Sequence, residues 1–393
     1  MARPVFLSYA WDDEDLADHL ELLLRLRGVP VWRDRRDMRW GVYNEEVVLN
    51  AIEHECSGFI LVLTDAVMNS RFILDIELPA MDRRISSDPN FFAGAVFARN
   101  TGISQSANEL RAASGVELGS LLGSPLASED LNADLRRVAH SVLRSYLRSV
   151  LSDGEEPAVK LETRSVVPEA DPAPIHLSWS PPLAADLDGV GDHVWDDELL
   201  PALSDLRAGL EEVTQVRRLK VSGRPHLSAA LALGFEFRAP TGWVLALHQD
   251  GLELDTARVE PDPAGWTLVR QPCSSGDDRR LVLCLHATKD VTRAMREHCR
   301  SLPPARVELH VRPPGGPGHL TVDGATGNAL VSAIAHKVAE TRTRFGVTET
   351  HLYLACPWAM AAALGWHLSS VGALVSHEAD VERSSYRAAC RLT

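Results

Sequence analysis

The sequence has few of the features that mark disulfide-rich or metal-binding proteins. Its 393 residues include six cysteines, and no two of them form a CxxC pair. Neither an HExxH motif nor a ladder of cysteine and histidine occurs among the 15 histidines, so we expect no metal site. Three of the cysteines, Cys56, Cys284 and Cys356, adjoin or lie within apolar runs, which predicts buried thiols in a reducing cytosol.

Long hydrophobic runs and excess positive charge are also missing. The most apolar segment, residues 352–366, is too short to span a bilayer and is interrupted by Pro357. A strand pattern begins at Val5 without a preceding signal peptide, so we expect a cytoplasmic protein that does not contact a membrane. The net charge of −14 argues against broad binding to duplex nucleic acid, although it leaves a local basic pocket open.

Residues 4–98 alternate between short apolar strands and helices. Strands are predicted at 5–9, 29–32, 58–63 and 91–97, with helices between them. The first helix has a leucine stripe and ends at Gly28, which suits a left-handed C-terminal residue. Short apolar strands between helices predict an α/β fold, in which a parallel sheet is covered by helices on both faces.

The following residues predict a boundary between domains. A stretch rich in Ser, Gly, Ala and Asn (100–128) leads into an amphipathic helix at about 131–150. Residues 152–174 carry proline and acidic side chains without periodicity, which is typical of a linker. We therefore predict one domain at 1–152, a linker at 153–174, and a second domain at 175–393.

An internal repeat organises the second domain. Residues 219–235 and 352–366 both read as a strand, a proline at a helix start, a helix of small residues, and glycine followed by an aromatic residue. Further strand–helix pairs flank the two copies, at 175–179 with 196–214 and at 281–285 with 288–299. The repeat predicts two similar doubly wound lobes, at about 175–280 and 281–393, with both helix N-termini facing one shared pocket.

Glu77 is the strongest single candidate for chemistry. On a helix it shares a face with Ile73, Leu74, Ala80 and Met81, so its carboxylate would lie on the buried stripe. A buried carboxylate must be paired or must line a cleft. Pairing with an arginine or a backbone amide is an equally good reading of this position alone, and Pro79 is expected to bend the helix.

The strand ends supply other candidates. Residues 8–11 and Trp40-Gly41 would stand at the carboxyl edge of the first sheet, where α/β proteins bind ligands. In the second domain, the helix starts at Gly223-Arg224-Pro225-His226 and Cys356-Pro357-Trp358, together with Lys289 at a third strand end, suit a nucleotide with its phosphates. Such turns occur in every α/β protein, and a Trp358 that belongs to the core is the alternative.

The N-terminal pattern resembles a TIR domain over roughly the first 150 residues. The residues that carry the resemblance are Phe6-Leu-Ser-Tyr-Ala, Asp15-Leu-Ala, Leu20, Leu24-Arg, Gly28-Val-Pro-Val-Trp32-Arg-Asp34, Gly41, Ile52, Phe59-Ile-Leu-Val-Leu-Thr64, Asn69-Ser70, Glu77-Leu78 and Ala80. Phe72 stands where tryptophan is usual, and Pro79 is unusual inside that helix. The resemblance implies a flavodoxin-like domain with a parallel sheet.

The C-terminal half, from about residue 165, is similar to a SAVED domain, a fused pair of Rossmann-like (CARF-like) lobes that senses cyclic oligonucleotides in bacterial CBASS anti-phage immunity. The carriers are Arg224-Pro225, Ala229-Ala-Leu-Ala-Leu-Gly234, Trp266, Leu352, Pro357, Leu364-Gly365, Glu378 and Tyr386. The order of TIR and SAVED resembles that of known CBASS effectors.

This resemblance implies a NAD⁺ glycohydrolase switched on by a cyclic oligonucleotide, with NAD⁺ as substrate and no further cofactor. Glu77 matches the catalytic glutamate. The implied substrate residues are Tyr9, Ala10, Trp11, Asp34, Trp40 and Gly41, and the implied ligand residues are Arg224, Pro225, His226, Lys289, Cys356, Pro357 and Trp358. Residues 33–44 match the loop that completes a neighbouring TIR active site, which predicts head-to-tail oligomers or filaments.

Three alternatives remain open at the level of sequence. The TIR domain could act as a non-enzymatic signalling adaptor, or it could cyclise NAD⁺ into a signal. The C-terminal half could serve as a dimerisation scaffold. Which cyclic oligonucleotide is sensed does not follow from the residues, and the resemblance alone favours a cyclic oligoadenylate such as cyclic tri-adenylate.

Overall fold

A computed structural model of the chain describes residues 3–33, 45–98, 103–116, 122–126, 130–164, 173–180, 194–258, 265–273, 279–318, 323–380 and 384–393. The chain forms two compact units. The first contains residues 1–155, 168–178 and 204–215, and the second contains residues 156–167, 179–203 and 216–393.

The first unit is built on a five-stranded sheet whose described strand pairs are all parallel. Its strand order is β2-β1-β3-β4-β5, which is the flavodoxin-like order. The strands are β1 (Val5–Ser8), β2 (Val31–Trp32), β3 (Gly58–Leu63), β4 (Phe92–Phe97) and β5 (Leu122–Pro125). The predicted parallel α/β fold of this region is confirmed.

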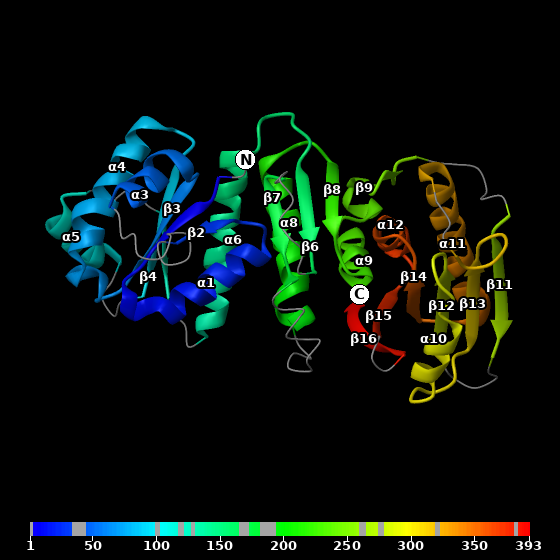
Figure 1. Cartoon of the computed structure of the whole chain (residues 1–393). Coiled ribbons are helices and arrows are strands. Elements are labelled where there is room, and N and C mark those ends of the chain that lie inside the picture. Colours follow the sequence, from blue (N-terminus) through cyan, green and yellow to red (C-terminus); the bar gives the residue numbers. More distant parts are fainter. Residues whose placement is uncertain are drawn as a thin grey trace. The chain divides into compact units, whose positions relative to one another are not determined.

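Helices cover both faces of this sheet (Figure 1). They are α1 (Glu14–Leu26), α3 (Glu45–Asn50), α4 (Leu78–Ser87), α5 (Ile103–Ser114) and α6 (Leu131–Val150). On one face, Phe6 stacks on Trp32 and Phe59 and joins the apolar stripes of α3 and α4. α1 and α6 pack against each other on the opposite face. The predicted helix at 131–150 is confirmed at its stated bounds, whereas α5 and β5 lie in the stretch rich in Ser, Gly, Ala and Asn, for which no helix or strand was predicted.

The same unit also includes β7 (Ile175–Ser178) and the part of α8 (Leu200–Val213) that follows Ser204. The buried Arg27 guanidinium donates to Asp205 Oδ2 at 2.7 Å, and Asp205 Oδ1 lies 2.9 Å from His140 Nδ1. Asp205 therefore joins α8 to the end of α1 and to α6.

In the second unit, four strands lie in the order β10-β9-β8-β6. They are β6 (Ala158–Glu162), β8 (Arg218–Arg224), β9 (Val244–Gln249) and β10 (Leu252–Asp255), and α9 (Leu227–Glu236) follows β8. β6 pairs parallel with β8 and buries Val159 and Leu161. It lies inside the predicted linker, because two apolar residues at alternate positions were enough to make a strand once a partner strand was available.

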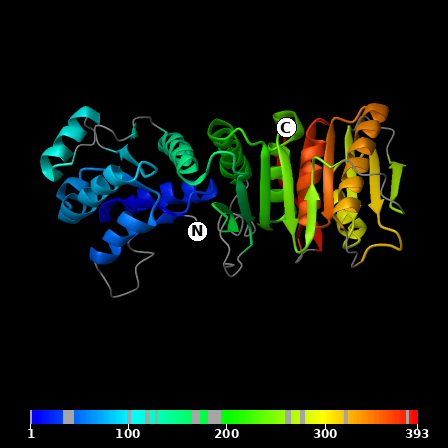
Figure 2. The same ribbon diagram turned by 90° about the horizontal axis from the view of Figure 1, so that it is seen from above.

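The other sheet of this unit has the order β11-β13-β12-β14-β15-β16. Its strands are β11 (Thr267–Pro272), β12 (Arg280–His286), β13 (Val307–Arg312), β14 (Glu349–Ala355), β15 (Ala373–Asp380) and β16 (Ser385–Leu392). The three helices between them are α10 (Thr292–Cys299), α11 (Gly324–Phe345) and α12 (Trp358–Leu368). α11 packs against β13 and α12 (Figures 1 and 2).

Both sheets of the second unit are mixed. Their central pairs are parallel, and β10, β11 and β16 add antiparallel strands at the edges. β11 falls within the predicted first lobe but pairs with β13 of the second sheet. The predicted α/β fold is confirmed, and the lobe boundary near residue 280 remains a prediction.

Candidate functional sites

Glu77 lies beside the carboxyl end of β1, where the strand order of the first sheet reverses. β1 pairs with β2 on one side and β3 on the other, and ligands bind at such switch points in α/β sheets. The Ser8 hydroxyl, at the last residue of β1, donates a hydrogen bond to Glu77 Oε2 at 2.5 Å. Glu77 is 5% exposed and Ser8 is buried, so this bond is shielded from water.

The helix that carries Glu77 contains a π-helical turn, Ile73–Glu77, near its start. The Leu78 N–H donates to the carbonyl of Ile73, five residues back. Pro79 explains the turn, because its ring would collide with the carbonyl four residues earlier in an α-helix and it has no N–H to donate. The helix therefore takes in an extra residue at this turn. The predicted buried stripe of Ile73, Leu74, Ala80 and Met81 is confirmed.

A cavity of about 370 Å³ opens at Glu77. Its volume falls within the range of small-molecule sites, which is about 300–1,000 Å³. The lining residues are Tyr9, Ala10, Trp11, Asp12, Ala66, Asn69, Ser70, Phe72, Ile73 and Glu77. The structure thus brings together Glu77 and three of the predicted substrate residues. The other three, Asp34, Trp40 and Gly41, lie outside the described residues.

Buried contacts hold the two sides of this cavity in place. The Arg33 guanidinium lies 4.4 Å from the centre of the Tyr9 ring and donates to Glu21 at 2.8 Å. Burial alone would lower the pKa of Arg33, but its hydrogen bonds to Glu21, Asp18 and Tyr9 raise it above the usual value. The sequence did not single out this arrangement, because Glu21 lies on α1, twelve residues before Arg33.

Trp11 is held differently, on a single 3₁₀ turn, Trp11–Asp13. The Thr64 hydroxyl, just after β3, donates to Asp13 Oδ2 at 2.5 Å and ties this turn to the sheet. The Trp11 side chain is 62% exposed, the largest exposed fraction among the exposed large apolar side chains of the described residues. An exposed indole at the rim of a cavity provides a surface for a flat ligand group.

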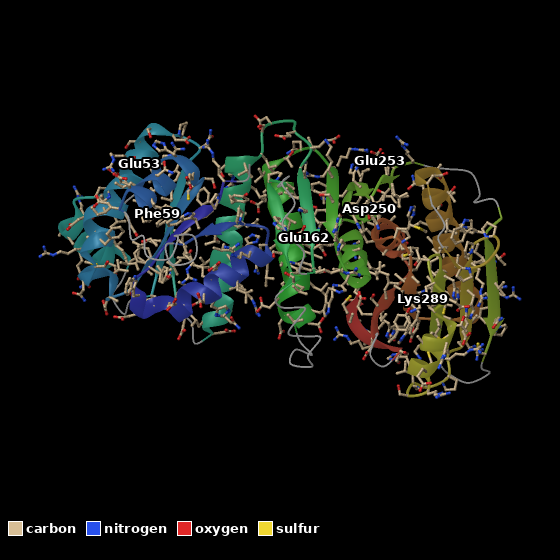
Figure 3. All side chains as sticks on the ribbon, in the orientation of Figure 1. Glu53, Phe59, Glu162, Asp250, Glu253 and Lys289 are labelled. Carbon is tan, nitrogen blue, oxygen red and sulfur yellow. The ribbon has the colours of Figure 1, made fainter. Side chains whose placement is uncertain are left out.

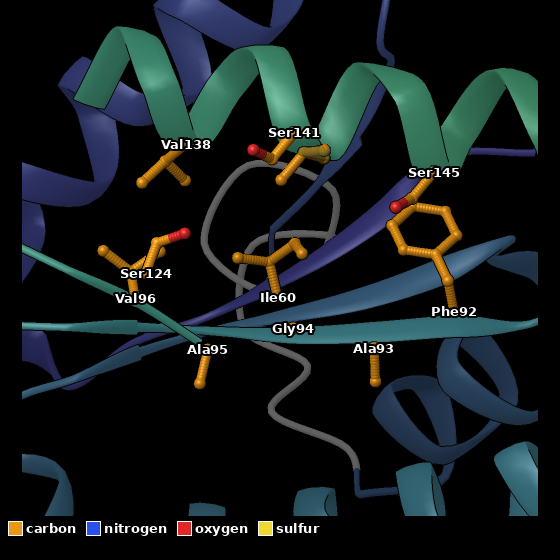
Figure 4. Close-up of a pocket in the computed structure, with 11 residues that line it drawn as sticks. Ile60, Phe92, Ala93, Gly94, Ala95, Val96, Ser124, Val138, Ser141 and Ser145 are labelled. Atoms are coloured by element: carbon orange, nitrogen blue, oxygen red, sulfur yellow. The ribbon is translucent and has the colours of Figure 1, made fainter. Parts of the chain in front are cut away.

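A second cavity in the first unit lies between α6 and the sheet (Figure 4). It is lined by Val138, Ser141, Val142 and Ser145 of α6, by Ile60 of β3, by residues 92–96 of β4 and by Ser124 of β5. Its volume of about 30 Å³ is far below the roughly 300–1,000 Å³ of small-molecule sites, so it holds no nucleotide. The cavity at Glu77 is the better candidate for a substrate.

In the second unit, the start of α9 gathers polar residues from three strands. One hydroxyl, Thr163 Oγ1, accepts the His226 backbone N–H at 2.6 Å and lies 2.7 Å from His226 Nδ1. The Ser228 N–H donates to Glu378 Oε1 of β15 at 2.7 Å. The predicted phosphate position at this helix start therefore already holds a carboxylate.

Charges of both signs surround His226. Burial lowers the pKa of His226; the Glu378 carboxylate opposes that shift, and the cations of Arg164 and Arg387 add to it. Arg224 ends β8 and is exposed, while Pro225 is buried. Thr163 and Arg164 were not predicted, because they follow a strand that the sequence analysis placed in a linker.

The start of α12 has an equivalent arrangement. The Ala359 N–H donates to Gln249 Oε1, at the end of β9, at 3.0 Å. Cys356 is buried, and Trp358 is 5% exposed, so its ring offers no open face on which a base could stack. This burial fits the alternative of a core residue, and a ligand-binding role of Trp358 remains a prediction. The Trp358 indole N–H, however, has no hydrogen-bond partner within the described part of the chain.

Lys289 lies in the connection from β12 to α10 and is exposed (Figure 3). The neighbouring Thr288 N–H donates to the carbonyl of Ala355 at 2.9 Å. This bond brings the segment that carries Lys289 next to the end of β14, where Cys356 follows. Within the second unit, the predicted ligand residues thus form two groups, one at the start of α9 and one at the start of α12.

Comparison with known families assigns both parts of the chain. The TIR domain family matches residues 5–93. The SAVED family, the SMODS-associated and fused to various effectors sensor domain, matches residues 203–392. The chain has an N-terminal TIR domain and a C-terminal SAVED domain. Glu77 lies in the TIR match, and the starts of α9 and α12 lie in the SAVED match.

Solved structures that match the chain include the Cap4 SAVED/CARF-domain containing receptor of Acinetobacter baumannii with the cyclic trinucleotide 2'3'3'-cAAA, at 13% identity and a TM-score of 0.49, covering 85% of this chain and 80% of that one. The Moraxella osloensis Cap4 receptor matches at 13% identity and a TM-score of 0.44, covering 88% of this chain and 83% of that one. No curated protein matches the sequence. Among the described residues, none of the helices has both the length and the apolar character needed to cross a bilayer.

Proposed function

We propose that the TIR domain is a NAD⁺ glycohydrolase that is activated when the SAVED domain binds a cyclic oligonucleotide, as in a CBASS effector. The observation that carries this proposal is the Ser8–Glu77 pair. It places a buried, oriented carboxylate in a cavity of suitable size at the switch point of the sheet.

The chemistry required of Glu77 is electrostatic. Loss of nicotinamide leaves positive charge on the ribose C1′, and a nearby carboxylate stabilises such an oxocarbenium-like state. The carboxylate is most effective when water is excluded and its orientation is already fixed. Burial and the bond from Ser8 meet both conditions. Tyr9, Ala10 and Trp11 would flank the nicotinamide, and Asp34, Trp40 and Gly41 would complete the site.

In the SAVED domain, we assign ligand binding to the starts of α9 and α12. Arg224, His226 and Lys289 would meet phosphates, with Arg164 and Arg387 as additional cations. The Trp358 N–H, which has no hydrogen-bond partner among the described residues, would donate a hydrogen bond to the ligand beside Cys356 and Pro357. A cyclic oligoadenylate is the proposed activator, and cyclic tri-adenylate is the first to test.

Activation is proposed to occur by self-association. Ligand-bound chains would assemble head to tail, so that residues 33–44 of one TIR domain complete the site of the next. Contacts of this heterologous kind give open filaments when they do not close into a ring. Turnover should therefore rise more steeply than linearly with protein concentration.

The test measures NAD⁺ consumption by the full chain, alone and with a panel of cyclic di-, tri- and tetranucleotides. We expect turnover with one ligand and loss of turnover in Glu77→Gln, with ligand binding and assembly unchanged. Glu53→Gln is the matched control, because Glu53 (labelled in Figure 3) pairs with Arg83 at 2.7 Å and does not line the cavity.

Each other outcome has a defined meaning. Assembly on ligand without NAD⁺ loss would replace the enzyme with an adaptor and make Glu77 a structural acid. Cyclic ADP-ribose in place of ADP-ribose among the products would identify a cyclase. Turnover that does not respond to any ligand would reduce the SAVED domain to a scaffold.

Glu378 provides a separate test of the ligand site. In Glu378→Gln, an amide oxygen can still accept the Ser228 N–H, while the negative charge that would repel a phosphate is gone. We expect tighter ligand binding in this variant by calorimetry, and no change of affinity would place the phosphates elsewhere.

A further inference from the structure

The second sheet of the SAVED domain brings three metal-ligand side chains together. Cys284 and His286 are two residues apart on β12, so they point to the same face of the sheet. β13 runs parallel to β12, and its His310 is paired with Cys284. All three side chains are buried, and one ligand atom from each lies within 4.8 Å of the others.

The two imidazoles face each other through ring nitrogens. His286 Nε2 lies 3.1 Å from His310 Nδ1, and the rings are stacked with an interplanar angle of 18°. In a tetrahedral zinc site with Zn–N bonds of about 2.0–2.1 Å, two ligand nitrogens are about 3.3 Å apart. The observed separation is therefore close to that of two histidines on one ion.

Each histidine also has a carboxylate at its other nitrogen. His310 Nε2 lies 2.9 Å from Glu308 Oε2, and His286 Nδ1 lies 3.2 Å from Asp290 Oδ1. Metal-binding histidines nearly always donate their second N–H to such a group, which fixes the tautomer and strengthens the ligand. Two facing histidines that both have this support, next to a cysteine, form the donor set of a zinc site.

We propose that Cys284 Sγ, His286 Nε2 and His310 Nδ1 bind a Zn²⁺ ion in the SAVED domain, with a water molecule as fourth ligand. Binding releases the thiol proton of Cys284 to solvent. The ring proton of His286 moves from Nε2 to Nδ1, and the Nδ1–H group then donates a hydrogen bond to the Asp290 carboxylate. The ion would fasten β12 to β13 within the sheet.

Without metal, the same groups form a hydrogen-bonded chain. The Val291 N–H donates to His286 Nδ1, which leaves the proton of His286 on Nε2 to be donated to His310. Zinc binding breaks this chain and removes the acceptor of the Val291 N–H. That loss is small compared with three metal–ligand bonds. The metal itself deprotonates a thiol that coordinates it.

The sequence predicted no metal site because no metal-binding motif occurs within one segment. The ligands instead come from a Cys-x-His pattern on β12 and a Glu-x-His pattern on β13. The two histidines, His286 and His310, are 24 residues apart in the chain. The parallel pairing of β12 with β13 brings these two short patterns together in one site.

The experiment uses the full chain, purified without a histidine tag, stripped with a chelator and reloaded with Zn²⁺ under reducing conditions. We expect one zinc per chain by mass spectrometry, and a thiolate-to-metal charge-transfer band when Co²⁺ replaces Zn²⁺. Cys284→Ser and His310→Gln should lose the ion. Glu308→Gln should keep it with an affinity about 10–100-fold weaker, as expected for loss of a carboxylate behind a ligating histidine.

Cys390→Ser is the matched control, because Cys390 is also a buried thiol of this sheet but is not part of the ligand group. It should bind zinc as the unaltered chain does. Failure of the unaltered chain to take up stoichiometric zinc, or a Co²⁺ spectrum without a thiolate band, would overturn the proposal and leave a metal-free histidine relay. The Co²⁺ spectrum of the unaltered chain does not depend on whether any variant folds.

Discussion

Gly234 of α9 packs directly against the backbone of Ala362 in α12. A Cβ atom at Gly234 would lie 1.8 Å from the carbonyl oxygen of Ala362. The equivalent glycine of the other copy makes the reciprocal contact, since a Cβ at Gly365 would lie 2.1 Å from the carbonyl oxygen of Leu231. Each glycine thus meets the residue three positions before the other glycine. The two repeats of the SAVED domain are joined by this pseudo-symmetric crossing.

Gly234→Ala or Gly365→Ala should destabilise the SAVED domain. The added methyl group meets backbone atoms, which cannot rotate away, so the loss should reach or exceed the roughly 1–3 kcal/mol typical of overpacking. Thermal or urea unfolding measures this loss. Gly318→Ala is the control, because a Cβ at Gly318 meets nothing within 4 Å. Equal midpoints for the three variants would contradict the close crossing.

Ser8→Ala should lower NAD⁺ turnover while the protein stays folded. The substitution removes the hydrogen bond that orients the Glu77 carboxylate. Bonds to charged groups contribute about 1.5–3 kcal/mol, which corresponds to a decrease of roughly 10–100-fold in kcat. Ser57→Ala is the control, because the Ser57 hydroxyl bonds to the carbonyl of Arg3, before the start of β1 rather than at its carboxyl end. Unchanged turnover in Ser8→Ala would show that Glu77 needs no support from β1.

Pro79→Ala tests whether the π-helical turn positions Glu77. Alanine restores an N–H that can bond to the carbonyl of Asp75, and a regular α-helix becomes accessible. A change of register by one residue turns a side chain by about 100° around the helix axis. We expect turnover to fall at least about tenfold with equal or higher thermal stability, because proline is unfavourable by about 3 kcal/mol inside a helix.

The chain contains a matched control for this substitution. Another π-helical turn, Trp195–Leu199, is followed by Leu200 and Pro201 in the same pattern. Pro201→Ala should leave catalysis by the TIR domain unchanged. If Pro79→Ala keeps full activity, the turn has no role in placing the carboxylate.

Acid should destabilise the SAVED domain through His377 and His351. The two rings are stacked, and Nε2 of His377 lies 2.9 Å from Nδ1 of His351. Burial, with smaller contributions from the neighbouring His351 and His298, lowers the pKa of His377 to about 2. Burial likewise lowers the pKa of His351, where Glu349 opposes the shift and Arg280 adds to it.

These shifts determine the sign of the pH dependence. Both histidines are neutral in the folded chain, whereas in the unfolded chain they take up protons near pH 6.5. Their contribution to stability is complete above pH 6.5 and is lost as the pH falls towards the lowered pKa values. The slope is at most about 1.4 kcal/mol per pH unit for each histidine. Urea unfolding at pH 7.5 and pH 5 measures it, and His377→Asn should flatten the dependence. An equal slope in that variant would assign the effect to other groups.

Periodicity in the sequence was sufficient where an element carries its own pattern. The leucine stripe of α1, the run at Phe59 in β3 and the helix at 131–150 each bury a face that can be seen in the residues alone. The repeat likewise predicted α9 and α12. β6 and β5 were missed because four or five residues of weak pattern become strands only when a neighbouring strand supplies hydrogen bonds.

The candidate sites likewise contain some positions that a local pattern predicts and some contacts that only the fold creates. The sequence alone placed Glu77 on a buried helix face and Tyr9, Ala10 and Trp11 after a strand, because helical and strand periods fix those positions. Only the tertiary structure decided that Ser8 donates to Glu77, that Glu378 reaches Ser228, and that His310 lies beside Cys284. These pairs are 69, 150 and 26 residues apart in the chain. Their contacts depend on strand register and packing, which no local pattern of residues encodes.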